Sequence, residues 1–465
     1  MKLAKNLILN TDSYKTSMFL QMPAGTTGVF SYIESRGGRY DSTVFFGLQA
    51  FIKEYLTKPI TKEDIDVAEA IITAHGEPFN REGWEYILNE HGGKLPVVIK
   101  AVPEGTVVPV KNVLATIENT DPKCFWLTTY LETALLRAVW YGTTVASQSK
   151  SIKNVIQQYL EKTGDPGLIN FKLHDFGARG VSSMESAGIG GAAHLVNFMG
   201  SDTITGILFA REYYDADIAG FSIPAAEHST ITSWGRDSEV NAYRNMLNQF
   251  ARPGSIVAVV SDSYDVFNAC ENLWGGELKQ QIIDSGATLV IRPDSGDPEE
   301  ICVKVIQILD KKFGHTVNEK GFKVLNNVRI IQGDGVNENT VRCILGHYAV
   351  LGYSADNIAF GMGGALLQGI DRDTQKFAMK CSAAEINGEW VDVQKDPITD
   401  PGKKSKAGRV MLWKSENDEF VSSVGLPGWT DKGRGGWRPM LNVVFRDGEI
   451  VKEYTFDEVR ANSNK

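Results

Sequence analysis

Residues 255–265 read SIVAVVSDSYD, a run of apolar and mostly β-branched residues that ends in a polar cluster. The same arrangement recurs from residue 168 onward, in the segments LINFKLHDFG (168–177), GSDTITGILF (200–209), IAGFSIPAAEHS (218–229), ATLVIRPDSG (287–296), VRIIQGDG (328–335) and NIAFGMGG (357–364). Nearly continuous apolar strands are typical of a parallel sheet that is buried on both faces. The chain therefore predicts such a sheet, built from seven short strands.

The stretches between these strands have helical periodicity. Residues 238–251, 298–314 and 336–352 carry apolar side chains at helical spacing, and the last begins with Asn337 and Asn339 as candidate caps. The residues that close the strands are 26 to 40 positions apart, the size of one strand–helix unit; they are Asp175, Asp202, His228, Asp262, Asp294, Asp334 and Gly363. Strand–helix alternation with chemistry at the carboxyl ends of the strands predicts an α/β protein with a (β/α) barrel.

The flanking segments have a different pattern. Residues 96–118 alternate around turn signals, which predicts antiparallel strands, and residues 381–465 contain hairpin signals at INGEW and FRDGEIV. We therefore expect a barrel at 149–380 and a second, mixed α/β domain formed by 1–148 together with 381–465.

The composition excludes several classes of protein. The chain has 465 residues, 42% of them hydrophobic, and a net charge of −9, which is ordinary for a globular protein of more than one domain. An acidic balance argues against binding to nucleic acid or to anionic membranes. No apolar stretch approaches the roughly 18 residues of a membrane span, and the start lacks the long apolar core of a secretory signal. The five cysteines are scattered without a CxxC or Cys/His cluster, so we expect reduced thiols in a cytoplasmic protein and no structural zinc.

Two clusters near the middle of the chain carry candidate chemistry. HDFGARG (174–180) combines an aromatic ring, a carboxylate and an arginine at a strand end. This combination suits the stacking of a flat ring and the binding of an anion, or else a tight turn with a structural ion pair. His228 follows a buried strand and lies beside Glu227. A histidine held by a carboxylate can act as a base, a nucleophile or a metal ligand, although a structural histidine in a core has the same pattern.

The later strand ends are acidic, basic and glycine-rich. Asp262 and Asp294 could hold Mg²⁺ or accept hydrogen bonds from sugar hydroxyls, and Arg292 offers a bidentate phosphate donor. GDG (333–335) and GMGG (361–364) free backbone N–H groups at helix starts, which is a phosphate cradle common after the late strands of such barrels. Residues 395–409 form a basic loop that is either simply solvated or closes over a polyphosphate.

Nine segments resemble nicotinamide phosphoribosyltransferases, in the same order along the chain: TDSYK (11–15), HDFGARG (174–180), GSDT (200–203), PAAEHSTIT (224–232), VVSDSYD (259–265), IRPDSG (291–296), IQGDG (331–335), AFGMGG (359–364) and KDPITDP (395–401). The resemblance implies a type II phosphoribosyltransferase fold and a homodimer with two active sites shared between the subunits. It also implies that nicotinamide reacts with 5-phosphoribosyl-1-diphosphate to give nicotinamide mononucleotide and diphosphate, in NAD salvage.

The resemblance assigns the base to a stacked slot. Phe176 and Tyr14 of the partner subunit would sandwich the pyridine ring, and Asp202 would accept a hydrogen bond from the carboxamide. Two carboxylates about 4 Å apart repel by about 4 kcal/mol at an effective dielectric near 20, so Asp202 should exclude nicotinate. Further substrate contacts on the same grounds are Asp12 and Ser222. The family has a serine where this chain has Ala258, so ligands that use that hydroxyl should bind more weakly.

The remaining matches concern phosphates, ribose and metal. Arg179 and Arg292 would contact the diphosphate and phosphoribosyl groups, with Asp294 on the ribose hydroxyls. Further matches around ribose, the 5′-phosphate, the diphosphate and ATP are Gly333, Asp334, Gly363, Gly364, Arg36, Lys395 and Lys403, with Arg372 and Lys380 lent by the second subunit. Asp262 and Asp294 are the candidate neighbours of Mg²⁺.

His228 matches the histidine that the family phosphorylates from ATP. The resemblance implies that ATP is a facultative co-substrate, whose hydrolysis is coupled to tighter substrate binding. Either Glu227 or Asp262 would orient the imidazole ring.

Three other functions remain open. A nicotinate or quinolinate phosphoribosyltransferase shares the barrel, but an acid-using site should present a cation or a neutral donor where Asp202 lies. An unrelated phosphate-binding barrel, such as an isomerase or aldolase, explains the glycine-rich strand ends but not the histidine cluster. A catalytically silent barrel would bind ligands without turnover, yet the full set of polar strand ends is present.

Overall fold

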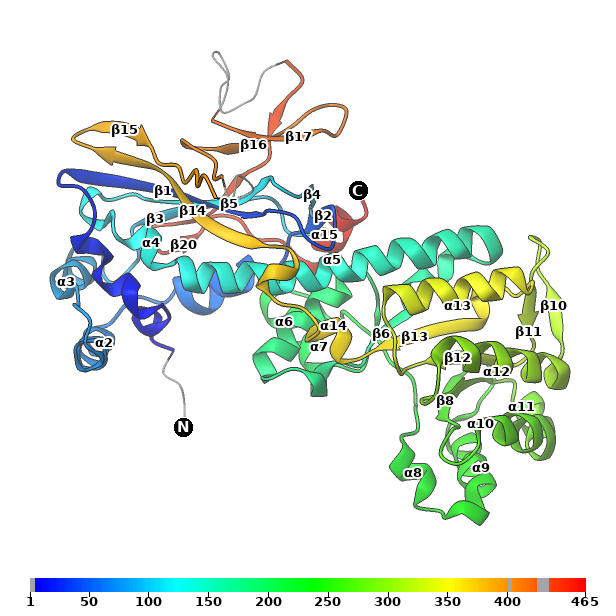
Figure 1. Cartoon of the computed structure of the whole chain (residues 1–465). Coiled ribbons are helices and arrows are strands. Elements are labelled where there is room, and N and C mark those ends of the chain that lie inside the picture. The colour runs from blue at the N-terminus through cyan, green and yellow to red at the C-terminus, as the bar shows by residue number, and fades with distance from the viewer. Residues whose placement is uncertain (1–4, 400–403, 425–434) are drawn as a thin grey trace. The chain divides into compact units, whose positions relative to one another are not determined.

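The computed structural model describes residues 5–399, 404–424 and 435–465 of the chain (Figure 1). These residues form two compact units. Unit 1 comprises Met1–Ser147, Ala210–Ala216 and Asp371–Lys465, and unit 2 comprises Gln148–Phe209 and Asp217–Ile370. Within the described ranges, no helix is both long and apolar enough to cross a membrane.

Unit 2 is built around a parallel sheet with the strand order β7-β6-β13-β12-β9-β8. Its strands are β6 (Leu173–Asp175), β7 (Gly200–Ser201), β8 (Ile256–Val260), β9 (Thr288–Arg292), β12 (Val328–Gln332) and β13 (Ile358–Met362). Residues 221–225, the closing segment, join the two edge strands: Phe221 pairs with Gly200 of β7, and Ala225 pairs with Ala258 of β8, both in parallel. The sheet therefore closes on itself through seven segments, and the predicted (β/α) barrel is confirmed.

Helices alternate with these strands, as Figure 1 shows for α12 and α13. The helices of this part of the chain are α6 (Met184–Leu195), α7 (Ile204–Tyr214), α8 (His228–Thr232), α9 (Glu239–Phe250), α10 (Val266–Asn268), α11 (Lys279–Ser285), α12 (Pro298–Phe313), α13 (Glu338–Val350) and α14 (Gly364–Leu367). The residues of α7 from Ala210 onward belong to unit 1. Helices α9, α12 and α13 confirm the three periodic stretches of the sequence. Asn337 caps α13 by accepting from the N–H groups of Asn339 and Thr340 at 2.9 and 3.2 Å.

Part of the strand prediction is wrong around β6 and β7. Residues 166–171 form a 3₁₀ helix before β6, and the run TITGILF after β7 belongs mostly to α7. The Thr203 N–H donates to the Ser201 hydroxyl at 3.0 Å, so the chain turns directly from a two-residue strand into a helix. A short apolar run has the same composition in a buried helix as in a buried strand, and its periodicity cannot separate the two.

Apolar side chains fill the inside of the barrel. Ala258, Val290 and Ile331 form a buried cluster, one from each of β8, β9 and β12. Phe176 and Ile223 pack against this cluster, and so does Ala359 of β13. Phe176 and Ile223 come from the end of β6 and from the closing segment. The interior is therefore apolar and bordered by one aromatic ring.

Unit 1 contains an antiparallel sheet in the order β15-β14-β1-β5-β3-β19-β20. Its strands are β1 (Thr26–Ser35), β3 (Val97–Ala101), β5 (Val113–Asn119), β14 (Phe377–Ile386), β15 (Glu389–Asp392), β19 (Asn442–Arg446) and β20 (Glu449–Ile450). The predicted pair within 96–118 is confirmed by β3 and β5, whereas β4 (Val107–Pro109) pairs with β2 (Ser42–Val44). Both predicted hairpins are present, with positive φ angles at Asn387–Gly388 and Asp447–Gly448, as two-residue hairpin turns require.

Candidate active site

The polar ends of β8 and β9 meet at His228, the first residue of α8. The Nε2 atom of His228 lies 2.9 Å from Oδ1 of Asp262, and its Nδ1 atom lies 4.0 Å from Oδ2 of Asp294. Arg292, the last residue of β9, donates to the same Asp294 oxygen at 2.6 Å. Four of the residues singled out in the sequence therefore form one cluster, which we call the histidine cluster.

Asp262, not Glu227, orients the imidazole ring. The Asp262 side chain is only 5% exposed, and its second oxygen accepts a hydrogen bond from the hydroxyl of Ser295. Glu227 instead accepts from the hydroxyl of Ser229. A carboxylate can only accept, so Nε2 of His228 is the donor, and in the neutral imidazole Nδ1 keeps the lone pair. Ser295 was not singled out in the sequence, although it is part of the IRPDSG motif.

The ring of Phe176 lies where two glycines leave room for it. A Cβ atom on Gly361 of β13 would fall 1.9 Å from Cε2 of Phe176. A Cβ atom on Gly333 would fall 3.0 Å from Oδ1 of Asp294, 3.4 Å from Nε of Arg292 and 3.6 Å from the same ring. The Arg292 guanidinium also lies 5.9 Å from the centre of the ring. The aromatic residue, the arginine and the carboxylate are thus neighbours.

Asp202 leaves the barrel at the same level as Phe176, because Asp175 of β6 pairs with Ser201 of β7. The carboxylate of exposed Asp202 accepts from the Ser222 hydroxyl at 2.6 Å. Asp175 itself is fully buried and accepts from the N–H of Gly177 at 2.7 Å. Burial raises the pKa of Asp175 to about 6.

Two glycine-rich turns pack together beside this aromatic residue. A Cβ atom on Gly177 would lie 2.9 Å from the carbonyl oxygen of Gly363, and one on Gly180 would lie 2.9 Å from Cα of Gly364. Arg179, which lies between Gly177 and Gly180 in the chain, is exposed. Asp334, which follows β12, is exposed as well. The phosphate-binding candidates of the barrel are therefore accessible to a ligand.

Unit 1 holds the other predicted residues. Lys380 of β14 is partly buried, and burial lowers its pKa, as do the nearby positive charges of Arg36, Lys15 and Lys395, while Glu132 opposes them. These four basic residues form a cationic cluster. Three other predicted residues also belong to unit 1. The side chain of Tyr14 is 56% exposed. The carboxylate of Asp12 accepts from the Thr133 hydroxyl at 2.7 Å, and Arg372 forms an ion pair with Asp373 at 3.0 Å. Lys403 lies outside the described residues.

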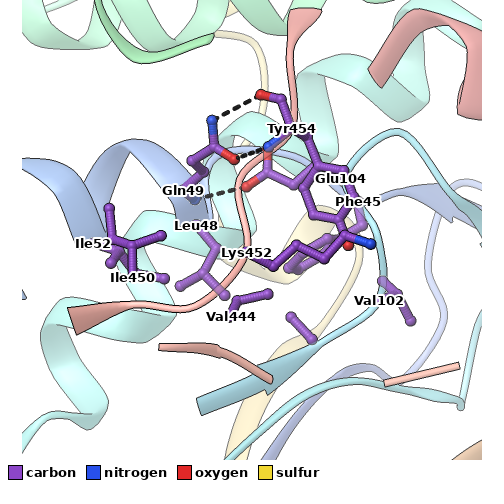
Figure 2. A pocket seen from close by; sticks show the side chains of 11 residues that line it. Phe45, Leu48, Gln49, Ile52, Val102, Glu104, Val444, Ile450, Lys452 and Tyr454 are labelled. Atoms are coloured by element: carbon purple, nitrogen blue, oxygen red, sulfur yellow. Dashed lines mark hydrogen bonds between the residues drawn. The ribbon is translucent and has the colours of Figure 1, made fainter. Parts of the chain in front are cut away.

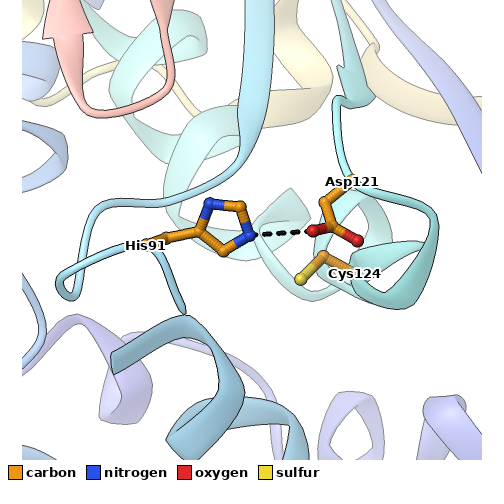
Figure 3. A group of neighbouring side chains, drawn as sticks. All are labelled: His91, Asp121 and Cys124. Atoms are coloured by element: carbon orange, nitrogen blue, oxygen red, sulfur yellow. Dashed lines mark hydrogen bonds and ion pairs between the residues drawn. The ribbon is translucent and has the colours of Figure 1, made fainter. Parts of the chain in front are cut away.

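One group in the described part of unit 1 has the atoms of a metal site. His91, Asp121 and Cys124 present ligand atoms within 4.8 Å of one another (Figure 3). Oδ2 of Asp121 already accepts from Nε2 of His91 and from the hydroxyl of Tyr86, each at 2.9 Å. Burial raises the pKa of the Cys124 thiol to about 12, so it remains protonated. The polar contacts are complete without a cation, so we assign this group to structure.

A second buried group of unit 1 also serves the fold. Glu104 accepts from the N–H groups of Gly47 and Gln49 at 3.0 and 2.6 Å and from the Tyr214 hydroxyl at 2.6 Å. It lines a pocket with Gln49 and Tyr454, whose mutual hydrogen bonds are visible in Figure 2. The space open to a water-sized molecule there is about 10 Å³, enough for about one water molecule. This pocket is too small for an organic substrate.

Comparisons with known proteins cover both units. The family model of the nicotinamide phosphoribosyltransferase N-terminal domain matches residues 6–99, and that of the nicotinate phosphoribosyltransferase (NAPRTase) family matches residues 171–426. A nicotinamide phosphoribosyltransferase from Xanthomonas campestris pv. campestris is 57% identical over 99% of this chain and 98% of its own length. One from Acinetobacter baylyi is 32% identical over 97% of this chain and 95% of its own length.

Solved structures share the fold at low identity. A nicotinate-nucleotide pyrophosphorylase from Pyrococcus furiosus matches with a TM-score of 0.64 and 17% identity, covering 100% of this chain and 96% of that one. Human nicotinic acid phosphoribosyltransferase matches with a TM-score of 0.56 and 14% identity, covering 98% of this chain and 92% of that one.

Proposed function

Because the chain belongs to the nicotinamide phosphoribosyltransferase family, we propose that its barrel joins nicotinamide to 5-phosphoribosyl-1-diphosphate in NAD salvage. The products are nicotinamide mononucleotide and diphosphate. The observation that carries this function is the 57% identity, which extends over 99% of the chain. The polar strand ends, which meet around His228 and Phe176, supply the chemistry.

The reaction breaks the bond between ribose C1 and the diphosphate oxygen, which leaves with the electron pair. The pyridine nitrogen donates its own lone pair to C1 and becomes positively charged. Such a reaction passes through a cation-like ribose, so it depends on positioning, on stabilisation of the departing anion and on a dry slot for the base.

Phe176 supplies one wall of that slot. Its ring borders the apolar interior of the barrel, and Tyr14 of the partner subunit would cover the opposite face of the pyridine. One oxygen of Asp202 is engaged by Ser222, which steadies the carboxylate while it accepts from the carboxamide N–H. Nicotinate would bring a second carboxylate, and a repulsion of about 4 kcal/mol corresponds to roughly a thousandfold preference for the amide.

Arg292 is the main protein donor for the diphosphate. Its Nε atom is buried and has no hydrogen-bond partner among the described residues, so the protein leaves this donor unsatisfied. Arg179 and the N–H groups of the turns at Gly333 and Gly363 add further donors. The cationic cluster of unit 1 suits a polyphosphate on its own, because Lys380 there lies close to like charges that an anion would neutralise.

Mg²⁺ fits the histidine cluster only in part. Both oxygens of Asp262 are engaged by His228 and Ser295, and Oδ2 of Asp294 is engaged by Arg292. Among the described residues, nothing donates to Oδ1 of Asp294, so this oxygen is our candidate ligand. Most other ligands would come from diphosphate oxygens and water, as is usual for Mg²⁺. The ion would neutralise the charge that develops on the diphosphate.

ATP is a proposed co-substrate that phosphorylates His228. The imidazole side chain is 43% exposed, and the free lone pair of Nδ1 can attack the γ-phosphorus. The bond from this phosphorus to the ADP oxygen then breaks, and ADP leaves with the electron pair. Asp262 stabilises the positive charge that forms on the ring. With a phosphohistidine next to Arg292, the site would bind Mg²⁺ and diphosphate more tightly.

A homodimer is supported by exposed apolar side chains on unit 2. Met184 is 74% exposed, and Ile204 and Leu208 on one face of α7 are 69% and 53% exposed. Phe171 and Phe221, also exposed, lie with ring centres 6.3 Å apart. Large exposed apolar side chains of this kind suit a protein–protein interface. Sedimentation of the purified protein as a monomer at micromolar concentration would contradict the dimer.

The direct test is product formation. We expect the purified protein, given phosphoribosyl diphosphate and Mg²⁺, to form nicotinamide mononucleotide, and to use nicotinate far more slowly in a parallel reaction. An Asp202→Ala variant should narrow this preference, with Asp334→Ala as a matched exposed carboxylate that should not. Faster use of nicotinate by the unmodified protein would overturn the proposed substrate.

A further inference from the structure

The hydroxyl of Ser295 completes a chain of hydrogen bonds that ends at the imidazole of His228. Ser295 donates to one oxygen of Asp262, and the other oxygen of Asp262 lies 2.9 Å from Nε2 of His228. The three side chains come from three different elements, since Ser295 follows β9, Asp262 follows β8 and His228 begins α8. A contact between separate loops of this kind is not a by-product of a local turn.

Asp262 depends on these two donors because it is almost out of contact with water. Its side chain is 5% exposed, and a polar group that is buried in this way needs hydrogen-bond partners within the protein. Rotation about the last side-chain bond of an aspartate is soft, with no sharp staggered minimum. Two donors on opposite oxygens therefore fix the plane of the carboxylate and, through it, the orientation of the imidazole.

The other groups around His228 do not replace the Ser295 hydrogen bond. Asp294 faces the other ring nitrogen of His228 at 4.0 Å and is itself paired with Arg292. Burial raises the pKa of Glu239 of α9, and the nearby negative charges of Asp265 and Asp262 add to this effect. Among the described residues, the Ser295 hydroxyl is therefore the donor that engages the second oxygen of Asp262.

We propose that Ser295 is a positioning residue for phosphorylation of His228 by ATP: it holds the carboxylate of Asp262 in plane, so that the imidazole of His228 keeps the orientation in which Nδ1 can attack. This inference rests on the proposed ATP-dependent step. Without the hydroxyl, the carboxylate of Asp262 is free to rotate. The imidazole then loses its fixed orientation.

The test compares Ser295→Ala with Ser295→Thr, which keeps the hydroxyl. Ser295 is exposed, so its replacement by alanine opens no cavity, and the position has room for the extra methyl group of threonine. Ser233→Ala is the matched control, because the Ser233 hydroxyl donates only to the backbone of its own helix α8. The measured quantity is the rate at which acid-labile phosphoryl-enzyme forms from γ-labelled ATP, and the melting temperature of each variant checks its folding.

We expect about tenfold slower phosphorylation in Ser295→Ala and near-normal rates in Ser295→Thr and Ser233→Ala. Equal labelling rates in Ser295→Ala and in the unmodified protein would overturn the inference. Slower labelling in Ser295→Ala that threonine does not restore would overturn it too, since that result indicates a purely structural role. Absence of label in the unmodified protein would instead overturn the proposed ATP-dependent step.

Discussion

Replacing Gly361 with alanine places a methyl carbon in contact with the ring that we assign to the nicotinamide slot. The new Cβ atom would lie 1.9, 2.3 and 2.7 Å from Cε2, Cδ2 and Cζ of Phe176. The φ angle of Gly361 is not positive, so alanine is compatible with the backbone and the whole conflict falls on the ring. The ring must therefore move.

The displacement follows from the contact distances. Ordinary contact begins at 3.4 Å, so the ring has to withdraw by about 1.5 Å, because Gly361 is held in the middle of the barrel by β13. Misplacement of a positioning group by about 1 Å costs roughly 100-fold in rate. Overpacking of a filled interior costs roughly 1–3 kcal/mol in stability, which a two-unit protein of this size tolerates. We therefore expect kcat/KM for nicotinamide to fall about 100-fold in a protein that still folds.

The assay is the initial rate of nicotinamide mononucleotide formation at varied nicotinamide, with thermal unfolding in parallel. Gly346→Ala is the control. Gly346 lies within α13, and the added Cβ atom would be 3.4 Å from its nearest neighbour, the Tyr159 hydroxyl. Alanine there should stabilise the helix by about 1 kcal/mol and leave kcat/KM unchanged. A folded Gly361→Ala enzyme with kcat/KM within twofold of the unmodified protein would refute the reasoning.

Three further outcomes are expected. His228→Ala should abolish ATP hydrolysis and leave slow transferase activity, because the phosphoryl acceptor is lost while the slot at Phe176 remains; unchanged phosphate release would contradict this. Ala258→Ser should raise the affinity for ligands whose amide side reaches the barrel interior, where Ala258 packs near Phe176. Equal affinities of the variant and the unmodified protein, measured by calorimetry, would contradict this role of the hydroxyl. Burial lowers the pKa of Lys172 to about 7 from 10.5, so between these pH values the unfolded chain binds more protons and the free energy of unfolding rises with pH. In Lys172→Met, the free energy of unfolding in urea should therefore rise less between pH 7 and pH 9 than in the unmodified protein. An identical rise in the variant would contradict the lowered pKa of Lys172.

The barrel could be predicted because buried parallel strands have a strong apolar signature. Strands β8, β9, β12 and β13 each lie within a segment that the sequence marks, and each is followed by the expected polar or glycine residue. Such residues collect at one edge of a parallel sheet by topology alone. This is why His228, Asp262 and Asp294 could be grouped before their distances were known.

Other features depend on distances that periodicity does not encode. Strand β7 has only two residues, and the closing segment makes only isolated bridges, so neither has a periodic signal. The choice between Glu227 and Asp262 as the partner of His228 depends on the path of a loop. In unit 1, β1 pairs with β14, which follows it by more than 300 residues, and local sequence patterns do not determine such a pairing.

The closing segment connects two parts of the site. Ser222, which holds Asp202, lies on this segment, and His228, which is held by Asp262, begins α8 six positions further along the chain. The backbone between them is therefore a short covalent route from the imidazole to the carboxamide acceptor, outside the packed interior. Among the described residues, this segment pairs with its neighbouring strands only at two isolated bridges, so it is the least regular part of the barrel wall.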